Sequence, residues 1–191
     1  MIYPVVAYGD PVLKKRATDI KKGTDIKQLV EDMFETMYAA NGVGLAAPQI
    51  GQSIRLFVID SKPMDENEEN PQGVKKAFVN PNIIEETGEE WGFEEGCLSI
   101  PGVRAEVLRP ANIKIHYFDE SWNEFTEDFD GIVARIIQHE YDHIEGVLFV
   151  DHLSAMKKRL LKSRLINISK GDVKADYRMR FPLANKRVSI R

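Results

Sequence analysis

The sequence predicts an α+β fold in which a mostly antiparallel sheet packs around a central helix, with one further helix toward each end of the chain. Stretches with strand patterning occupy the middle of the chain, and apolar residues at helical spacing mark segments on either side. The 191 residues contain no internal repeat, and this length suits one sizeable core. We therefore expect one domain over residues 1–170, followed by a basic tail over 171–191.

The first expected element is a helix over 26–40, where apolar residues recur at helical spacing. Asp25 is typical of its start, and Gly42 of the region after its end. The Gly42–Gln49 stretch is rich in glycine and contains a proline, so we expect irregular backbone there. A strand is expected at 55–60.

The middle of the chain predicts short strands joined by polar segments. Residues 61–76 carry several acidic residues, two prolines and a glycine, which predicts an exposed loop. Strands are expected at 77–79, 103–108, 112–118 and 124–129, with a turn at 119–123 between the last two.

Two helices are expected in the last third of the chain. Gly131 and Gly146 bound the central helix, and Ser154 begins a final helix that ends near Ser169. The apolar stripe of the final helix is expected to comprise Met156, Leu160, Leu161, Leu165 and Ile168.

Composition excludes several classes of protein. Charged residues make up 29% of the chain and the net charge is −4, which gives no overall attraction for nucleic acid. No apolar run approaches the roughly 20 residues that span a membrane, and we expect no signal peptide. Cys97 is the single cysteine, which excludes an internal disulfide and indicates a reducing, cytoplasmic setting.

The run Gln138-His-Glu-Tyr-Asp-His143 is the clearest indication of a catalytic site in this sequence. His139 and His143 are four residues apart, so on a helix they lie on one face and can bind one metal ion. Glu140, which lies between them, can act as general base on a water at that ion. Two solvent-exposed histidines on an amphipathic helix are the alternative, and we favour the metal site.

A catalytic metal site of this kind needs a third protein ligand. Cys97 is the leading candidate, and the neighbouring Gly96 permits an unusual backbone angle or a close approach. A lone cysteine is more often a small buried apolar residue. His116, in an alternating strand, and His152, at a helix start, are the rivals.

Three motifs occur in register: Gly42-Val-Gly-Leu-Ala-Ala-Pro-Gln49, Glu95-Gly-Cys-Leu-Ser99 and Gln138-His-Glu-Tyr-Asp-His143. Together they closely resemble peptide deformylase of the bacterial type, over about residues 1–170. The resemblance implies a hydrolase that removes formyl from the N-terminal formyl-methionine of newly made polypeptides. It implies that Cys97, His139 and His143 hold the metal and that Glu140 is the general base.

The resemblance also implies that the Gln49 side-chain amide and the Leu98 backbone N–H stabilise the oxyanion. We expect Val43, Gly44, Gly96 and Ile136 to contact the substrate, with Gly44 also at the catalytic centre. The glycines would let an extended peptide lie close to the backbone and pair with it as an added strand. Ile132 is expected mainly in the core, whereas Arg135 is expected either to line the mouth of the pocket or to reach solvent, and we favour solvent.

Two charged residues beside the motifs have open roles. Glu95 is expected either to brace the cysteine loop through Arg109 or Arg104, or to lie in solvent. Asp142 is expected either to orient a helix neighbour or to bond backbone, and the sequence does not decide between these.

The identity of the metal stays open from the ligands alone. One thiolate and two imidazoles suit Zn²⁺ but also accept Fe²⁺, Ni²⁺ or Co²⁺. The family resemblance implies Fe²⁺ as the working ion. A metallopeptidase and a structural zinc module are the rival functions; the upstream cysteine argues against the first, and a site of only three ligands against the second.

The C-terminal end is basic. Basic residues outnumber acidic ones six to two over 172–191, and the preceding helix carries Lys157, Lys158 and Lys162. The alternatives are a solvated helix face with a disordered tail, or a transient contact with ribosomal RNA, which the resemblance favours. We expect truncation after Gly171 to weaken ribosome binding and to leave turnover of a short peptide near normal. We also expect a monomer that contacts no membrane.

Overall fold

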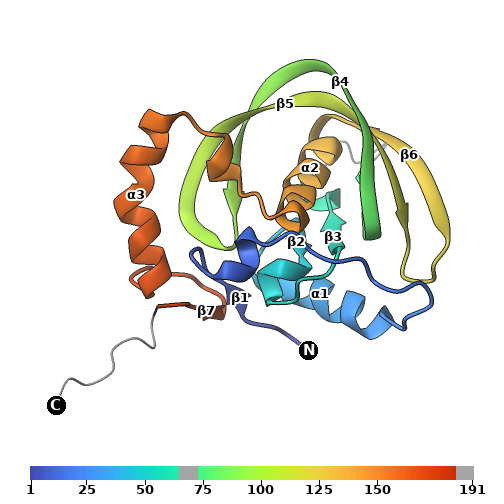
Figure 1. Cartoon of the computed structure of the whole chain (residues 1–191), viewed down its shortest axis with the longest axis horizontal. Coiled ribbons are helices and arrows are strands. Elements are labelled where there is room, and N and C mark those ends of the chain that lie inside the picture. The colour runs from blue at the N-terminus through green and yellow to red at the C-terminus, as the bar shows by residue number, and fades with distance from the viewer. Residues whose placement is uncertain (65–72, 184–191) are drawn as a thin grey trace.

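A computed structural model describes residues 1–64 and 73–183 of the chain. Two long strands frame the molecule. Strand β4 (Lys75–Cys97) pairs antiparallel with β5 (Ile100–Phe118), and the two arch over the central helix α2 (Gly131–Glu145) (Figure 1). Register shifts interrupt the pairing at four places, and these irregularities let the β4–β5 pair bend. The arch therefore provides a curved wall around α2.

The main sheet has five antiparallel strands in the order β2-β3-β4-β5-β6. The three shorter strands are β2 (Gly44–Ala46), β3 (Leu56–Asp60) and β6 (Glu124–Asp130). Strand β2 lies at one edge of this sheet. The observed α+β architecture confirms the predicted fold class.

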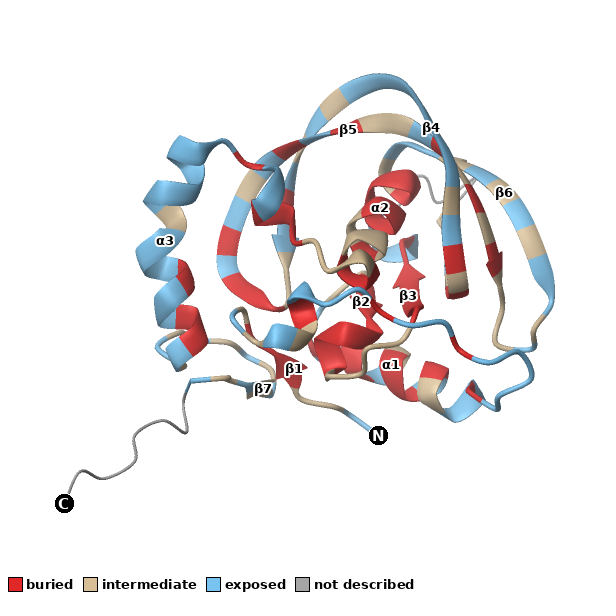
Figure 2. Cartoon of the chain, viewed as in Figure 1, coloured by how far each residue is buried: buried red, intermediate tan, exposed pale blue. Residues whose placement is uncertain are grey.

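Strand β3 is buried on both faces because helices cover both sides of the sheet. Phe57 and Ile59 pack with the apolar face of α2. Leu56 and Val58 point the other way and pack with α1 (Lys27–Ala39). Because successive side chains point to opposite, covered faces, all five residues of β3 are buried. Helix α2 lies inside the molecule, and most of it has the colour of buried residues in Figure 2.

The last helix, α3 (Ala155–Lys170), lies outside the arch and is largely exposed (Figure 2). Ser154 caps its start and Gly171 its end. Leu165 and Ile168 are buried, but Met156 and Leu160 are 75% and 77% exposed. The predicted apolar stripe is therefore wrong for its first turns, because only the C-terminal half of α3 packs on the domain.

A second, two-stranded sheet joins the two ends of the described chain. Strand β1 (Val5–Val6) pairs in parallel with β7 (Met179–Arg180). Part of the segment that we expected as a tail thus lies beside the N-terminal strand, with Phe181 against the same apolar cluster as Val6. Residues 184–191 of that segment lie outside the described residues.

Short 3-10 helices complete the chain. They are η1 (Pro11–Lys14), η2 (Ala47–Ile50), η3 (Lys62–Met64) and η4 (Phe149–His152). Strand β2 and helix η2 occupy the Gly42–Gln49 stretch, where we expected irregular backbone; the backbone pairing with β3 outweighs its poor local propensity.

The expected strand at 77–79 is only one part of β4. Residues 84–90 are mostly exposed and rich in glutamate, a poor strand former, and backbone pairing with β5 makes them a strand. Within the expected loop at 61–76, Lys75 and Lys76 belong to β4, and 65–72 lie outside the described residues.

Candidate functional site

Helix α2 presents His139, Glu140 and His143 to the interior. The rings of His139 and His143 are 5.0 Å apart between centroids and nearly perpendicular. Gly146 ends the helix in the left-handed conformation with φ 76°, one turn after His143. The predicted helix and the predicted spacing of the two histidines therefore agree with the structure.

Cys97 lies at the end of β4, immediately before the two-residue turn Leu98-Ser99 that leads into β5. Its Sγ is 3.3 Å from His143 Nε2. One donor atom from each of Cys97, His139 and His143 lies within 4.8 Å of the other two. The structure thus brings Cys97 to the two histidines, whereas His116 and His152 lie elsewhere.

The rival histidines have other partners. His116 Nε2 lies 2.8 Å from Glu124 on the neighbouring strand β6. His152 Nε2 lies 2.7 Å from Asp142, which also pairs with Arg109. Asp142 therefore orients neighbouring side chains, one of the two roles left open by the sequence.

Glu95 forms the layer behind the histidines. One carboxylate oxygen lies 2.8 Å from His139 Nδ1, and Arg109 binds the carboxylate through two nitrogens. Burial raises the pKa of Glu95, but its bonds with His139 and Arg109 outweigh burial and hold the pKa well below its ordinary value. A carboxylate on Nδ1 leaves Nε2 of His139 directed to the Cys97 side.

Arg135 also belongs to this buried layer and lines the cavity, so the favoured prediction that it reaches solvent is wrong and the alternative, a place at the pocket, agrees with the structure. Its side chain is 2% exposed and donates to Glu95, to the Val107 carbonyl and to the Trp91 carbonyl. The arch of β4 and β5 covers this face of α2, and Trp91 and Glu95 lie in a part of β4 where the sequence predicted no strand. Glu95 is braced by Arg109, as one alternative expected, while Arg104 stays exposed.

The donor set has the chemistry of a site for a divalent metal ion. Burial raises the pKa of the Cys97 thiol, but His143 and His139 outweigh burial and bring the pKa down to about 5. Cys97 therefore offers a thiolate near neutral pH. Thiolate and two imidazoles together suit Zn²⁺ or Fe²⁺, so the residues present fit such an ion.

Glu140 lies beside these donors in a space that Gly44 leaves open. A Cβ on Gly44 would stand 2.4 Å from Glu140 Oε1. Burial raises the pKa of Glu140 to about 7, against the opposing effect of the two histidines. Glu140 Oε2 is buried and has no hydrogen-bond partner within the part of the chain that the structure describes. Such a carboxylate is available to a bound water or substrate.

The structure corrects one expectation about the glycines, the unusual backbone angle at Gly96. Gly44 makes room for Glu140, and a Cβ on Gly42 would stand 2.9 Å from Leu98 Cδ1. Gly96 has no positive φ, and a Cβ there would make an ordinary 3.5 Å contact with Arg104. The close approaches therefore involve side chains of the chain itself, and Gly96 needs no unusual backbone angle.

Gln49 is buried and oriented by its own backbone. Its Oε1 accepts from Ala46 N at 2.8 Å, which directs Nε2 toward Cys97 Sγ and Ser99 Oγ, each at 3.4 Å. The Leu98 N–H has no hydrogen-bond acceptor within residues 1–64 and 73–183. Both groups are thus donors next to the Cys97 sulfur.

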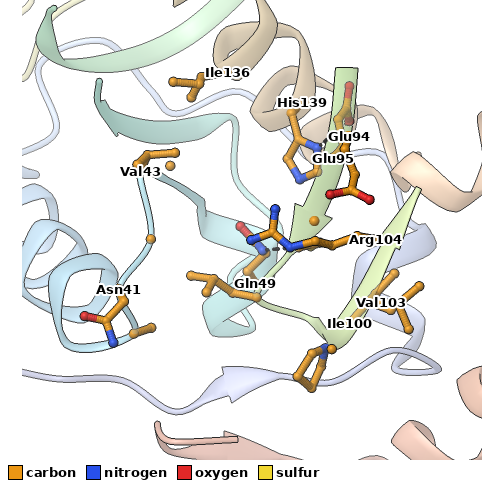
Figure 3. A pocket seen from close by; sticks show the side chains of 18 of the residues that line it. Asn41, Val43, Gln49, Glu94, Glu95, Ile100, Val103, Arg104, Ile136 and His139 are labelled. Atoms are coloured by element: carbon orange, nitrogen blue, oxygen red, sulfur yellow. Dashed lines mark hydrogen bonds and ion pairs between the residues drawn. The ribbon is translucent and has the colours of Figure 1, made fainter. Parts of the chain in front are cut away.

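A cavity of about 570 Å³ opens onto these groups, a usual size for a ligand site. Val43 and Ile136 lie along one side, and Val103 and Arg104 of β5 lie along another (Figure 3). Gly44, Gly96, Leu98 and Ile132 also line it, so all the expected substrate-contacting residues meet in one place.

The sequence reasoning missed the contribution of residues 174–177, which line this cavity. Tyr177 donates from its hydroxyl to the Leu98 carbonyl at 2.7 Å. A signal was present, because Val173, Ala175, Tyr177, Met179 and Phe181 alternate with polar residues as in a strand.

Comparison with known proteins decides the family. The profile of the family described as Polypeptide deformylase matches residues 2–159. The chain belongs to the peptide deformylase family. The peptide deformylase of Cytophaga hutchinsonii is 65% identical over 96% of this chain and 99% of its own length, and that of Christiangramia forsetii is 56% identical over 97% and 99%.

Solved structures agree with this assignment. A peptide deformylase from Thermus thermophilus has a TM-score of 0.80 at 38% identity, covering 90% of this chain and 99% of that one. One from Legionella pneumophila has a TM-score of 0.78 at 38% identity, with 90% and 98% covered.

Members of this family are hydrolases that remove the N-terminal formyl group from newly made polypeptides and use one divalent metal ion. The chain is an enzyme of this kind, which confirms the activity expected from its motifs and excludes the metallopeptidase and structural zinc alternatives. Within the described residues, no helix is long and apolar enough to cross a membrane.

Proposed function

We propose that the cluster of Cys97, His139 and His143 is the metal centre at which this chain hydrolyses the N-formyl bond, with Glu140 moving the protons. The proposal rests on one observation: these three donors lie together beside Glu140, whose carboxylate is buried and has one oxygen without a partner among the described residues. A divalent ion held there supplies Lewis-acid chemistry, lowering the pKa of a water and polarising the formyl oxygen.

Glu140 takes the proton of the attacking water and later delivers it to the departing amine. A pKa near 7 suits both transfers, because the group changes protonation state at small cost near neutral pH. Gly44 allows the carboxylate to remain in this place.

Gln49 Nε2 and the Leu98 N–H donate to the negative oxygen that develops as the formyl carbon becomes tetrahedral. Gln49 is held by the Ala46 N–H, so its amide needs no reorientation during the reaction. Loss of one such donor costs about 2.7–4 kcal/mol of barrier in other enzymes of acyl transfer.

The methionine side chain enters the apolar part of the cavity, where Val43 and Ile136 contact it beside Gly44 and Gly96. The rest of the peptide lies extended beside the free edge of β2. Backbone pairing of this kind accepts many sequences after the first residue.

The direct test is Glu140→Ala, with metal content and turnover of a formyl-Met peptide measured on the same sample. We expect metal to be retained and kcat to fall by at least about 100-fold, because Glu140 is the one carboxylate with a buried, unpartnered oxygen among the described residues. Turnover equal to that of the parent at full metal content would contradict the assignment of Glu140.

We propose Fe²⁺ as the working ion, with Zn²⁺, Ni²⁺ or Co²⁺ able to occupy the same donors. Protein purified without oxygen should contain iron and should lose both iron and activity in peroxide, which oxidises a thiolate ligand. A zinc-containing protein with full activity per metal atom, unaffected by peroxide, would contradict this choice.

The exposed basic face of α3 is proposed to contact ribosomal RNA transiently. Lys157, Lys158 and Lys162 are exposed and lie away from the cavity. Their reversal to glutamate should weaken ribosome co-sedimentation and leave peptide turnover unchanged, because such contacts depend on phosphate neutralisation. Reversal of Lys15, Lys21 and Lys27, also exposed, is the matched control. Equal binding by both triple variants at low salt would contradict the contact.

We also propose that the chain works as a monomer in the cytoplasm, whose reducing conditions keep Cys97 available as a thiolate. The mass of the metal-loaded protein in solution tests the oligomeric state.

A further inference from the structure

We propose that Tyr177 is a positioning residue for the reaction: its hydroxyl, bonded to the Leu98 carbonyl at 2.7 Å, holds the turn that carries the Leu98 N–H. The inference rests on the proposed function of that N–H as an oxyanion donor. It makes the segment after α3 part of the catalytic site.

The turn Leu98-Ser99 follows Cys97 directly, so its orientation sets where the Leu98 N–H lies relative to the Cys97 sulfur. Ser99 is held by the Tyr8 N–H on its carbonyl at 2.8 Å and by Gln49 on its hydroxyl. The carbonyl of Leu98 has the Tyr177 hydroxyl. Since the Leu98 N–H itself must stay free for substrate, bonds to the Leu98 and Ser99 carbonyls that follow it in the chain are the means left to orient it.

Both braces come from one structure, the two-stranded sheet of β1 and β7. The N–H groups of Val5 and Ala7 donate to the carbonyls of Arg178 and Arg180 at 2.8 and 2.9 Å. Tyr8 lies two residues after β1, and Tyr177 lies two residues before β7. The paired strands therefore present one donor from each chain segment to the same turn.

A simpler explanation is that the hydroxyl bond only closes the C-terminal segment against the domain. Apolar contacts of Val173, Met179 and Phe181 with the buried cluster of Val6 and Leu165 already do this. Tyr177 instead lines the cavity, and burial together with the charge of Cys97 raises its pKa well above the ordinary value. Its hydroxyl thus stays a donor throughout the working pH range.

The test compares Tyr177→Phe with Tyr117→Phe in the full-length, metal-loaded protein. Both variants lose one hydroxyl, but Tyr117 bonds to Glu127 in the sheet and does not line the cavity. For Tyr177→Phe we expect kcat to fall about tenfold with KM changed less than about twofold, since misplacement of one group affects the transition state more than binding. Tyr117→Phe should lose stability with kcat unchanged.

A second readout reports the turn directly. In the zinc-loaded protein, the backbone amide of Tyr8, which donates to the Ser99 carbonyl of this turn, should exchange with solvent about tenfold faster in Tyr177→Phe than in the parent, and at the parental rate in Tyr117→Phe. An unchanged kcat, or a lower kcat with unchanged exchange at Tyr8, overturns the inference. Glu140→Ala is measured alongside: its full activity would instead overturn the proposed function.

Discussion

At the scale of single residues, the site depends on how closely Gly44 and Glu140 approach each other. Glycine motifs are often explained by space for substrate, but a side chain at Gly44 would overlap the Glu140 carboxylate. The first and third motifs therefore depend on each other through a steric contact. The carboxylate is confined on the glycine side, and burial brings its pKa to about 7.

Gly44→Ala should displace the Glu140 carboxylate and lower kcat by about 100-fold, because a shift of about 1 Å in a catalytic group has an effect of that size. Metal content should stay at the parental level, since Cys97, His139 and His143 are untouched. Steady-state kinetics and metal analysis on one preparation check this. Parental kcat in the alanine variant would show that Glu140 can work from another position.

At the scale of elements, the sheet depends on polar pairs as well as on apolar packing. Strand β6 contributes Glu127, which accepts hydrogen bonds from Lys76 of β4 and from Tyr117 of β5. One carboxylate thereby links three strands. Burial raises the pKa of Glu127, but these two bonds outweigh it and lower the pKa below its ordinary value of 4.5.

Glu127→Gln should lower the free energy of unfolding by about 1 kcal/mol at pH 7, a modest effect because the side chain is partly exposed. A lowered folded-state pKa stabilises above pH 4.5 and is lost as the pH falls through the folded-state value. The difference from the parent should therefore shrink below pH 4.5. Urea unfolding across pH 3–7, with the exposed Asp128→Asn as control, tests this; a difference that grows in acid would contradict it.

At the scale of the whole molecule, the last described residues complete the domain. Strand β7 pairs with β1, and residues 174–177 line the cavity, although the composition of the segment resembles that of a solvated tail. We therefore expect truncation after Gly171 to lower peptide turnover, whereas the sequence alone led us to expect turnover near normal.

Truncation after Gly171 should lower the free energy of unfolding by about 3 kcal/mol, because half-buried Val173, Met179 and Phe181 leave the apolar cluster. It should also reduce kcat at least as much as Tyr177→Phe, since the hydroxyl brace is lost. Denaturant unfolding and peptide turnover of the truncated chain check both. Parental stability and turnover would mean that the segment adds nothing to the domain.

Local patterns in the sequence determined much of this protein. The spacing of His139, Glu140 and His143, the boundary glycines of α2 and the apolar periodicity of α1 depend on neighbours within a few residues, so they could be predicted. The order of the three motifs was sufficient to indicate the family. These features need no knowledge of which distant segments meet.

Only the tertiary structure decided the rest. Glutamate-rich residues become strand in β4 because β5 offers backbone partners, and Arg135 is buried because that arch covers α2. Gly44 meets Glu140, and Tyr177 meets Leu98, across large separations in sequence. Such contacts follow from the path of the whole chain, and local propensity carries no information about them.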